Sequence, residues 1–318
     1  MSVEVEAVGT SEAAPAALHV PVLLEETMAV LRPERGGRFV DATVGAGGHA
    51  EALLERGPAV RLLGLDRDPG ALAAASLRLV RFGARVELRH APFSGLAAAV
   101  GGEPVDGLLA DLGVSSMQLD DPARGFSWRG DGGPLDMRMD PTAGAPLGEV
   151  LAGLDDEALA EALRTLGEER HARRVARAVR RALDSERGIA DTAGLARVVR
   201  AAAGGALGGG RGDRWRRAGR VDSATRTFQA LRMLVNDETG ELRALLDAAP
   251  RLLAPGGVLC VISFHSGEDR PVKQAMRALV DGGGFERLTR KAVQAGDDEA
   301  ARNPRARSAK LRAVRRAA

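Results

Sequence analysis

Cysteine and aromatic residues are scarce in this chain of 318 residues, which contains one cysteine, no tyrosine and only 3% aromatic residues. The single cysteine, Cys260, excludes a disulfide framework and a cysteine-based metal site. The histidines are scattered and show no metal-ligand spacing, standing at His19, His49, His90, His171 and His265. We therefore expect no metal ion to take part in the function.

Long apolar runs are also missing. No stretch approaches the roughly 18 consecutive apolar residues of a membrane span, so we predict no membrane association. The acidic, alanine-rich N-terminus has neither the basic start nor the apolar centre of a signal peptide. We expect residues 1–17 to form a disordered tail and the protein to be cytoplasmic.

Positive charge is unevenly distributed along a chain whose net charge is only +2. Residues 302–318 hold seven basic side chains and no acid, and residues 211–220 hold five arginines against Asp213. A helical stretch at 171–181 adds five more arginines. Each cluster alone could be a solvated surface, but the three together indicate contact with the phosphates of a nucleic acid.

A glycine-rich turn between two apolar runs is the strongest local signal. Residues 39–49 read Phe-Val-Asp-Ala-Thr-Val-Gly-Ala-Gly-Gly-His, and the next apolar run, 62–65, ends on Asp66. Glycines in such a turn let the backbone approach a ligand closely, and an acid after the next strand can accept hydrogen bonds from ribose hydroxyls. The pattern therefore predicts a nucleotide-type cofactor site at the carboxyl edge of a parallel sheet.

The turn by itself leaves three interpretations open. Gly45, Gly47 and Ala50 satisfy the dinucleotide fingerprint, which is compatible with an NAD enzyme. An S-adenosylmethionine (SAM) methyltransferase places its adenosine in the same position, and a tight turn without any ligand is the third interpretation.

Strand-like and helix-like segments alternate through the first third of the chain, which is typical of parallel βαβ units. We predict strands at 38–41, 61–66, 85–89 and 105–111, separated by helices at 48–56, 69–81 and 94–100. Asp68, which is followed by Pro69, is predicted to cap the second of these helices. Residues 112–146 read as long ordered loops, residues 147–203 as helices and residues 225–253 as one further helix. After the turn at 255–257 we predict a buried strand at 258–264, and residues 285–289 and 309–314 can supply an antiparallel pair.

The fold class that follows is α/β, a Rossmann-like doubly wound sheet interrupted by an all-helical insertion. We assign residues 18–141 and 235–318 to the sheet domain and residues 142–234 to an inserted, substrate-recognising domain. Residues 204–220, rich in glycine and arginine, are predicted to be a mobile loop within this insertion.

Three positions near the predicted sheet edge carry candidate chemistry. Asp111 ends the fourth strand and would point at the reacting end of the cofactor, or else cap the following loop. His265, after the fifth strand, could orient substrate or accept a proton, or be structural. Trp128 could stack on a base or anchor its loop, whereas Phe126 is predicted to be core. The region after Asp111 lacks the acid or base that hydride transfer needs, which argues against NAD.

Taken together, the motifs resemble the bacterial 16S ribosomal RNA cytosine-N4 methyltransferases, the MraW family. The resemblance extends from about residue 18 to the end of the chain. It is carried by residues 19–26, 41–49, 65–69, 111–120, 124–127, 133–140, 167–170, 225–232, 263–266 and 303–308. Two departures, Met117 in place of a usual proline and Gly267 in place of a common leucine, remove no polar group.

The resemblance implies an enzyme that uses SAM to methylate N4 of a decoding-centre cytosine, position 1402, with the 16S rRNA of the small ribosomal subunit as its partner. The implied SAM contacts are Gly47, Gly48, His49, Asp66, Phe93, Asp111 and Gln118. The catalytic candidates are Asp111 and His265, and the candidate substrate contacts are Ser115, Ser116, Trp128 and Arg138. Methylation of DNA or of another RNA, and a non-catalytic RNA-binding factor with a vestigial SAM site, are the alternatives.

Overall fold

A seven-stranded sheet organises the chain, which a computed structural model describes over residues 21–204 and 222–318. The predicted tail at 1–17 and residues 205–220 of the predicted mobile loop lie outside the described residues. The strands are β1 (Gly37–Asp41), β2 (Val60–Asp66), β3 (Val86–His90), β4 (Val105–Asp111), β5 (Leu253–Ser263), β6 (Phe285–Arg287) and β7 (Lys310–Arg316). Their order across the sheet is β3-β2-β1-β4-β5-β7-β6.

Strands β1 to β5 pair in parallel, and β7 is antiparallel to both β5 and β6. The predicted α/β Rossmann-like class and the antiparallel terminal pair are confirmed. The α-helices are α1 (Leu24–Leu31), α2 (Gly48–Arg56), α3 (Pro69–Leu79), α4 (Leu96–Val100), α5 (Ser116–Asp120), α6 (Leu147–Gly153), α7 (Asp156–Gly167), α8 (Ala172–Leu183), α9 (Thr192–Ala202), α11 (Ser223–Val235), α12 (Glu238–Leu252), α13 (Ser266–Asp281) and α14 (Asp297–Arg302). Short 3₁₀ turns are η1 (Pro33–Arg35), η2 (Val80–Arg85), η3 (Phe93–Gly95), η4 (Pro122–Arg124) and η5 (Pro304–Ser308).

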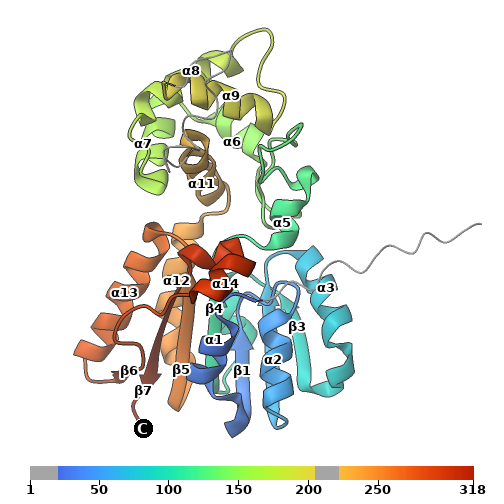
Figure 1. The fold of residues 1–318 in the computed structure, drawn as a ribbon, viewed down its shortest axis with the longest axis vertical. Coiled ribbons are helices and arrows are strands. Elements are labelled where there is room, and N and C mark those ends of the chain that lie inside the picture. Colours follow the sequence, from blue (N-terminus) through green and yellow to red (C-terminus); the bar gives the residue numbers. More distant parts are fainter. Residues whose placement is uncertain (1–20, 205–221) are drawn as a thin grey trace, which may run out of the picture.

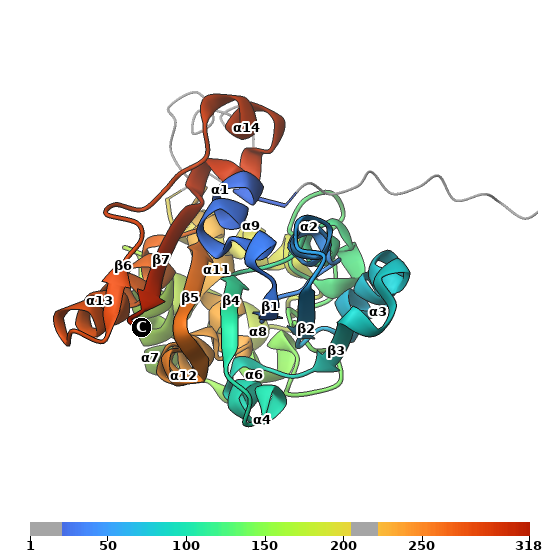
Figure 2. The same ribbon diagram turned by 90° about the horizontal axis from the view of Figure 1, so that it is seen from below.

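Successive residues of the central strands bury their side chains on opposite faces of the sheet, as the pleat requires. On β1, for example, Phe39 packs toward the face covered by α1, α2 and α3, whereas Val40 packs toward the face covered by α4, α12 and α13. The view along the sheet shows these two helical layers on either side of the strands (Figure 2). Burial on both faces accounts for strands that read as nearly continuous apolar runs.

The helices between β4 and β5 form a separate apolar cluster. Buried side chains of α6, α7, α8, α9 and α11 pack on one another and on loop residues such as Phe126 and Met137. We call these five helices the helical lobe; it stands over one end of the sheet (Figure 1). The remaining elements, which carry the sheet, are called the sheet domain.

Residues 112–146, predicted to be loops, contain the short helix α5, and two boundaries differ from the sequence prediction by several residues or more. The single helix expected over 225–253 is divided at Asn236 and Asp237, because Asp237 adopts a left-handed conformation with φ of 43°. The fifth strand begins at Leu253 rather than 258, because Leu253 already pairs with Val105, and a register shift lies between Val105 and Gly107. Both boundaries depend on tertiary contacts, which local sequence patterns do not predict.

Within the described ranges, no helix combines the length and the apolar character needed to cross a lipid bilayer. The same residues contain no group of three or more His, Cys, Asp or Glu side chains arranged to hold a metal ion.

Candidate active site

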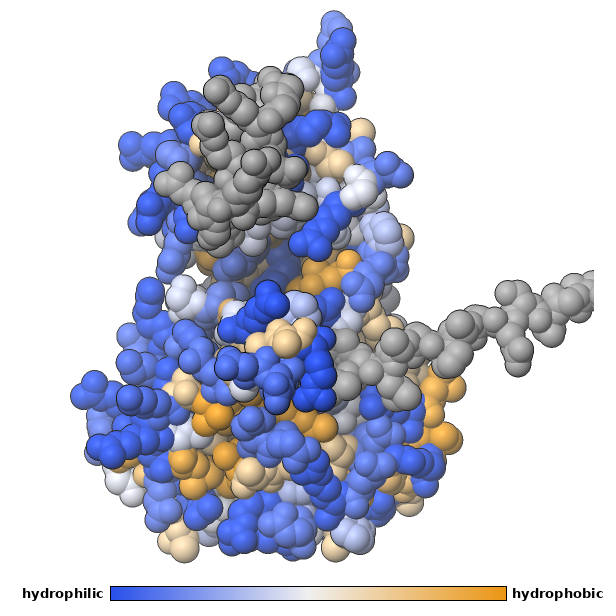
Figure 3. Space-filling model, viewed as in Figure 1, coloured by the Kyte–Doolittle hydropathy of each residue, from blue (hydrophilic) through white to orange (hydrophobic). Residues whose placement is uncertain are grey.

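A cavity of about 550 Å³ lies at the carboxyl ends of β1, β2, β4 and β5. The molecule is narrower at this level, between the helical lobe and the sheet domain (Figure 3). Predicted residues that line it are Gly45, Gly48, His49, Asp66, Phe93, Asp111, Ser115, Ser116, Gln118 and His265. Lining residues to which the sequence assigned no role include Arg232 and Met233 of α11, and Arg305 and Ser308 of the C-terminal segment.

The glycine turn after β1 forms one wall of this cavity. Gly47 has a φ of 84°, a left-handed conformation that favours glycine, and leads directly into α2. A Cβ atom on Gly48 would lie 2.5 Å from Cγ of Pro21, so no larger residue fits without displacing the chain. Gly45 and Gly48 line the cavity, whereas Gly47 faces α3, where a Cβ atom would lie 3.3 Å from Cγ of Leu79.

Asp66, at the end of β2, is fixed by backbone amides. Its Oδ2 accepts from the N–H of Gly45 at 2.9 Å, and its Oδ1 accepts from the N–H of Asp68 at 2.9 Å. Burial raises the pKa of Asp66 to about 6, against the lowering effect of these hydrogen bonds. The carboxylate is thus held in one orientation, with its remaining lone pairs available to hydroxyl donors in the cavity.

Asp111, at the end of β4, is the least satisfied carboxylate of the cavity. Its backbone N–H donates to Oγ1 of Thr43 at 2.6 Å, which fixes the main chain. Among the described residues, Oδ1 of Asp111 is buried and has no hydrogen-bond partner, while Oδ2 lies 3.9 Å from Nδ1 of His49. Burial, with the negative charges of Asp41 and Glu268, holds the pKa of Asp111 well above its ordinary value. A carboxyl group in this state can accept a hydrogen bond or a proton from a bound molecule.

His265 forms the opposite side of the cavity, before α13. Its Nε2 lies 3.0 Å from Oε1 of Glu268, a carboxylate that also accepts from the N–H of Phe264 at 2.8 Å. Arg232, which pairs with Glu238 at 2.6 Å, lies 3.9 Å from Glu268. Burial opposes ionisation of Glu268, but His265 and Arg232 outweigh it and lower the pKa of this group. The histidine therefore has a charged neighbour that orients its ring.

Gln118 reaches the site through a hydrogen-bond network. The backbone N–H of Ser115 donates to its Oε1 and its own N–H donates to Oγ of Ser115, a capping box at the start of α5. Its Nε2 donates to Oδ2 of Asp68 at 2.9 Å, and Nη1 of Arg124 donates to the same oxygen at 2.8 Å. The sequence predicted Asp68 as the cap of α3, which is confirmed, but gave no sign of its link to Arg124.

The network continues into the helical lobe. Nη2 of Arg124 donates to the carbonyls of Arg138 and Met139, and the N–H of Met139 donates to Oδ1 of Asn236. Arg67, next to Asp66, donates to the carbonyl of Asn236 at 2.9 Å. No sequence signal identified Asn236, because its partners are distant in the chain.

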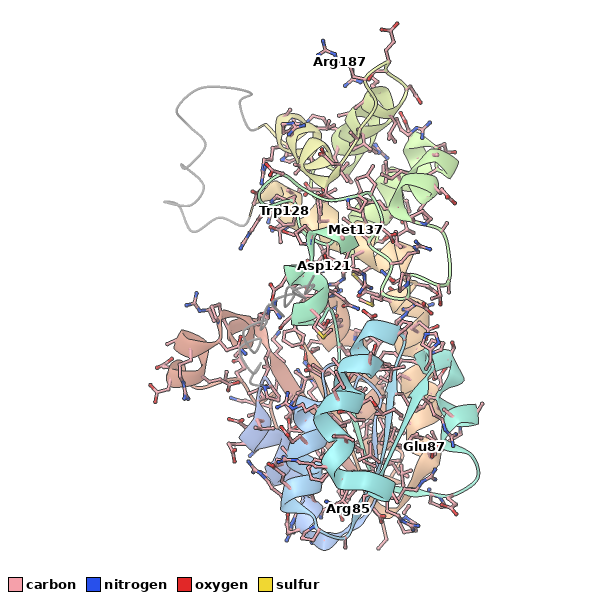
Figure 4. The ribbon with its side chains drawn as sticks, turned by 90° about the vertical axis from the view of Figure 1, so that its right-hand side faces the viewer. Arg85, Glu87, Asp121, Trp128, Met137 and Arg187 are labelled. Carbon is pink, nitrogen blue, oxygen red and sulfur yellow. The ribbon has the colours of Figure 1, made fainter. Side chains whose placement is uncertain are left out.

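Two candidate substrate contacts lie outside the cavity lining. Trp128 packs against Phe228 of α11, with ring centroids 4.6 Å apart and planes at 59°. It lies in the loop beside the helical lobe, away from the sheet (Figure 4). Arg138 donates twice to Asp136, from Nε and Nη2 at 2.8 Å each, and so fixes its own loop. Phe126 is buried, as predicted for a core residue.

Comparison with known proteins agrees with this arrangement. The sequence model of the MraW methylase family matches residues 16–317. A ribosomal RNA small subunit methyltransferase H from Sorangium cellulosum is 54% identical over 94% of this chain and 90% of its own length. The protein of the same name from Synechococcus is 50% identical over 94% of this chain and 93% of its own length.

Among solved structures, a putative rRNA methylase from Clostridium thermocellum aligns with a TM-score of 0.42 and 13% identity, over 95% of this chain and 99% of that one. Similarity at this level assigns neither ligand nor function. The family match and the closely similar relatives do: the chain belongs to the MraW methylase family, and it is a methyltransferase whose cofactor is S-adenosylmethionine.

Proposed function

We propose that this methyltransferase transfers the methyl group of SAM to the exocyclic N4 of a decoding-centre cytosine, position 1402, in the 16S rRNA of the small ribosomal subunit. The similar proteins from Sorangium and Synechococcus carry names that specify small-subunit ribosomal RNA. The observation that carries the proposal is Asp111, a buried carboxylate with an unpartnered oxygen among the described residues, in a cavity that fits a nucleoside cofactor.

The residues around the cavity fit SAM. The glycine turn offers bare backbone where a Cβ on Gly48 would collide with Pro21, and Asp66 offers fixed acceptors for ribose hydroxyls. We assign Phe93 to the adenine side, and Gly47, His49, Asp111 and Gln118 to further cofactor contacts. When bound, SAM supplies an electrophilic methyl group on a sulfonium, so no metal or covalent intermediate is required.

Asp111 would make the cytosine amine a better nucleophile. The lone pair of that amine is delocalised into the ring, so it is a poor nucleophile. The Asp111 carboxylate, whose side chain is 25% exposed, would accept an N–H of the amine, favouring a geometry in which the lone pair is available for in-line attack. The same carboxylate would take up the proton that the nitrogen loses, and its raised pKa makes it a better proton acceptor than an ordinary aspartate.

The remaining cavity residues would hold the base. Ser115, Ser116 and His265 offer hydrogen-bonding groups on the wall that carries Asp111 or facing it. The His265 side chain is 17% exposed, and its ring lies against Glu268, so it presents a ring of fixed orientation to a base in the cavity. We assign Trp128 and Arg138 to positioning of the loop between α5 and α6, because both are engaged within the protein.

We further propose that the helical lobe recognises the RNA. Four arginines of α8 are exposed and have no carboxylate partner among the described residues: Arg173, Arg174, Arg177 and Arg181. Exposed guanidinium groups without acidic partners are suited to phosphate contacts that position a nucleic acid without reading its sequence.

The direct test is methyl transfer from labelled SAM to small ribosomal subunits from cells that lack this enzyme, followed by mass spectrometry of the nucleosides. We expect N4-methylcytidine at one decoding-centre position. Free 16S rRNA and single-stranded DNA serve as parallel acceptors. Label on DNA alone, or measurable SAM binding with no label on any acceptor, would contradict the proposal.

A further inference from the structure

Arg305 is a cavity residue to which no role has been given. It lies in η5, where Oδ1 of Asn303 accepts the N–H of Arg305 at 3.2 Å. Ala306 and Ala309, on the same segment, are completely buried. This anchoring fixes the backbone, so the Arg305 side chain is presented to the cavity from a rigid turn.

The positive charge of Arg305 is only weakly compensated. Its Nη1 donates to the hydroxyl of Ser116, and its Nη2 lies 3.6 Å from Oδ1 of Asp120, a side chain that is 76% exposed. No other carboxylate of the described residues lies within ion-pair distance. An exposed carboxylate at this separation contributes little, because water screens it.

Two other arginines that line the cavity are engaged more closely, whereas Arg67 and Arg243 also line it without a carboxylate partner among the described residues. Arg78 pairs with Glu51 at 2.7 Å, and Arg232 pairs with Glu238 at 2.6 Å. Both carboxylates are largely buried, with 20% and 11% of their side chains exposed. Compared with these pairs, Arg305 retains charge and donors for a ligand that is not part of the protein.

The position of Arg305 indicates which ligand. Its partner Ser116 lies on the wall that continues from Asp111, and 30% of the Arg305 side chain is exposed, so it stands at the rim. Figure 1 shows α14, which precedes this segment, at the end of the sheet domain nearest the helical lobe. When a base enters a cavity from a polymer, its phosphates remain at the rim.

We propose that Arg305 binds a backbone phosphate adjacent to the target cytosine, an inference that rests on the proposed function. A guanidinium matches two phosphate oxygens with parallel N–H donors, which the single hydroxyl of Ser116 cannot do. The shared chemistry is that of an oxyanion, so the carboxylate of the cofactor is the competing source. The rim location favours the phosphate.

The test compares Arg305→Gln with Arg302→Gln. Arg302 ends α14 on the same segment, is exposed and donates only to a backbone carbonyl, so it is a matched control for loss of local charge. SAM affinity is measured by calorimetry, and subunit affinity by filter binding at several salt concentrations. We expect Arg305→Gln to weaken subunit binding by about 10- to 100-fold, with SAM affinity within about twofold of wild type and Arg302→Gln unchanged.

The salt dependence provides an independent readout. Loss of one phosphate contact reduces the slope of log affinity against log salt by about 0.7 to 0.9, an effect that a purely structural role would not produce. Arg305→Lys, which keeps the charge, should recover part of the affinity, and Asp120→Asn should increase it. Unchanged subunit binding in Arg305→Gln, or a loss confined to SAM affinity, would overturn the inference. If wild-type protein transferred no label to subunits, the proposed function itself would fail.

Discussion

Asp41 shows how single buried carboxylates set the electrostatics of the site. It is 1% exposed, and its Oδ1 accepts from the N–H of Thr43 at 3.1 Å. Burial raises the pKa of Asp41 from 3.8 to about 7, and the neighbouring charge of Asp66 adds to the rise. The negative charge of Asp41 in turn raises the pKa of Asp111. Burial therefore raises the pKa of three aspartates at this edge of the sheet, Asp41, Asp66 and Asp111.

This arrangement makes the free energy of unfolding depend on pH. Because the folded pKa of Asp41 lies above its unfolded value, the folded state binds more protons, and stability falls as pH rises from about 4 to about 7. The difference of roughly three pKa units corresponds to about 4 kcal/mol. We expect Asp41→Asn to be more stable than wild type at pH 8 and similar to it near pH 4. Urea unfolding at both pH values measures this, and equal stabilities at pH 8 would contradict it.

At the scale of elements, Arg124 joins three segments that the sequence keeps apart. It donates hydrogen bonds to Asp68 at the start of α3 and to the carbonyls of Arg138 and Met139. The N–H of Met139 in turn donates to Asn236, which directly follows α11. Asp68 is 3% exposed, so its charge depends on Arg124 and Gln118 for compensation. This junction couples the cofactor wall to the base of the helical lobe.

Removing Arg124 should therefore be costly. We expect Arg124→Met to lower the free energy of unfolding by about 3 kcal/mol, since it leaves a buried carboxylate without its cation and two carbonyls without donors. Arg138→Met is the control, because that arginine pairs with a partly exposed Asp136 within its own loop, where a loss of about 1 kcal/mol or less is expected. Denaturant unfolding compares the two variants. Similar losses of unfolding free energy in the two variants would contradict a larger contribution of Arg124 to stability.

The limits of sequence reasoning are clearest at these same elements. The parallel strands, the glycine turn and the Asp68 cap follow local rules of period and capping, and the structure has them close to the predicted positions. The break between α11 and α12 does not follow such local rules, because Asn236 forms hydrogen bonds with Met137 and Met139, about a hundred residues earlier. Arg305 belongs to a basic tail and to the stretch 303–308 that carries the resemblance, but neither indicates its place in the cavity, which depends on how the C-terminal segment packs.

For the whole molecule, the proposed function assigns different roles to the helical lobe and the sheet domain. The sheet domain carries the residues proposed to bind the cofactor, and the lobe carries the exposed arginines of α8. We expect replacement of Arg173, Arg174 and Arg177 by Gln to weaken binding to small subunits and to lower the salt slope by about 0.7 to 0.9 per lost phosphate contact. SAM affinity should stay unchanged.

The control for this triple variant is Arg277→Gln, on the sheet domain. Arg277 is exposed on α13 and pairs with Asp281 at 3.2 Å, so its loss should leave subunit binding as it is. Filter binding over a range of salt compares the two proteins. If the α8 variant bound small subunits with wild-type affinity and salt dependence, the proposal that the α8 arginines contact the RNA would be wrong.

In the proposed reaction, the Asp111 carboxylate orients the amine and takes up its proton. The rate of single-turnover methyl transfer at saturating SAM reports on both roles. For wild type, we expect the rate to rise with pH and then level off, because Asp111 must be ionised and its pKa is raised. Asp111→Asn keeps the shape of the side chain and should lower the plateau by about 10²- to 10⁴-fold and abolish the acidic limb. A variant with the wild-type plateau, or one fully restored by more SAM, would contradict the account.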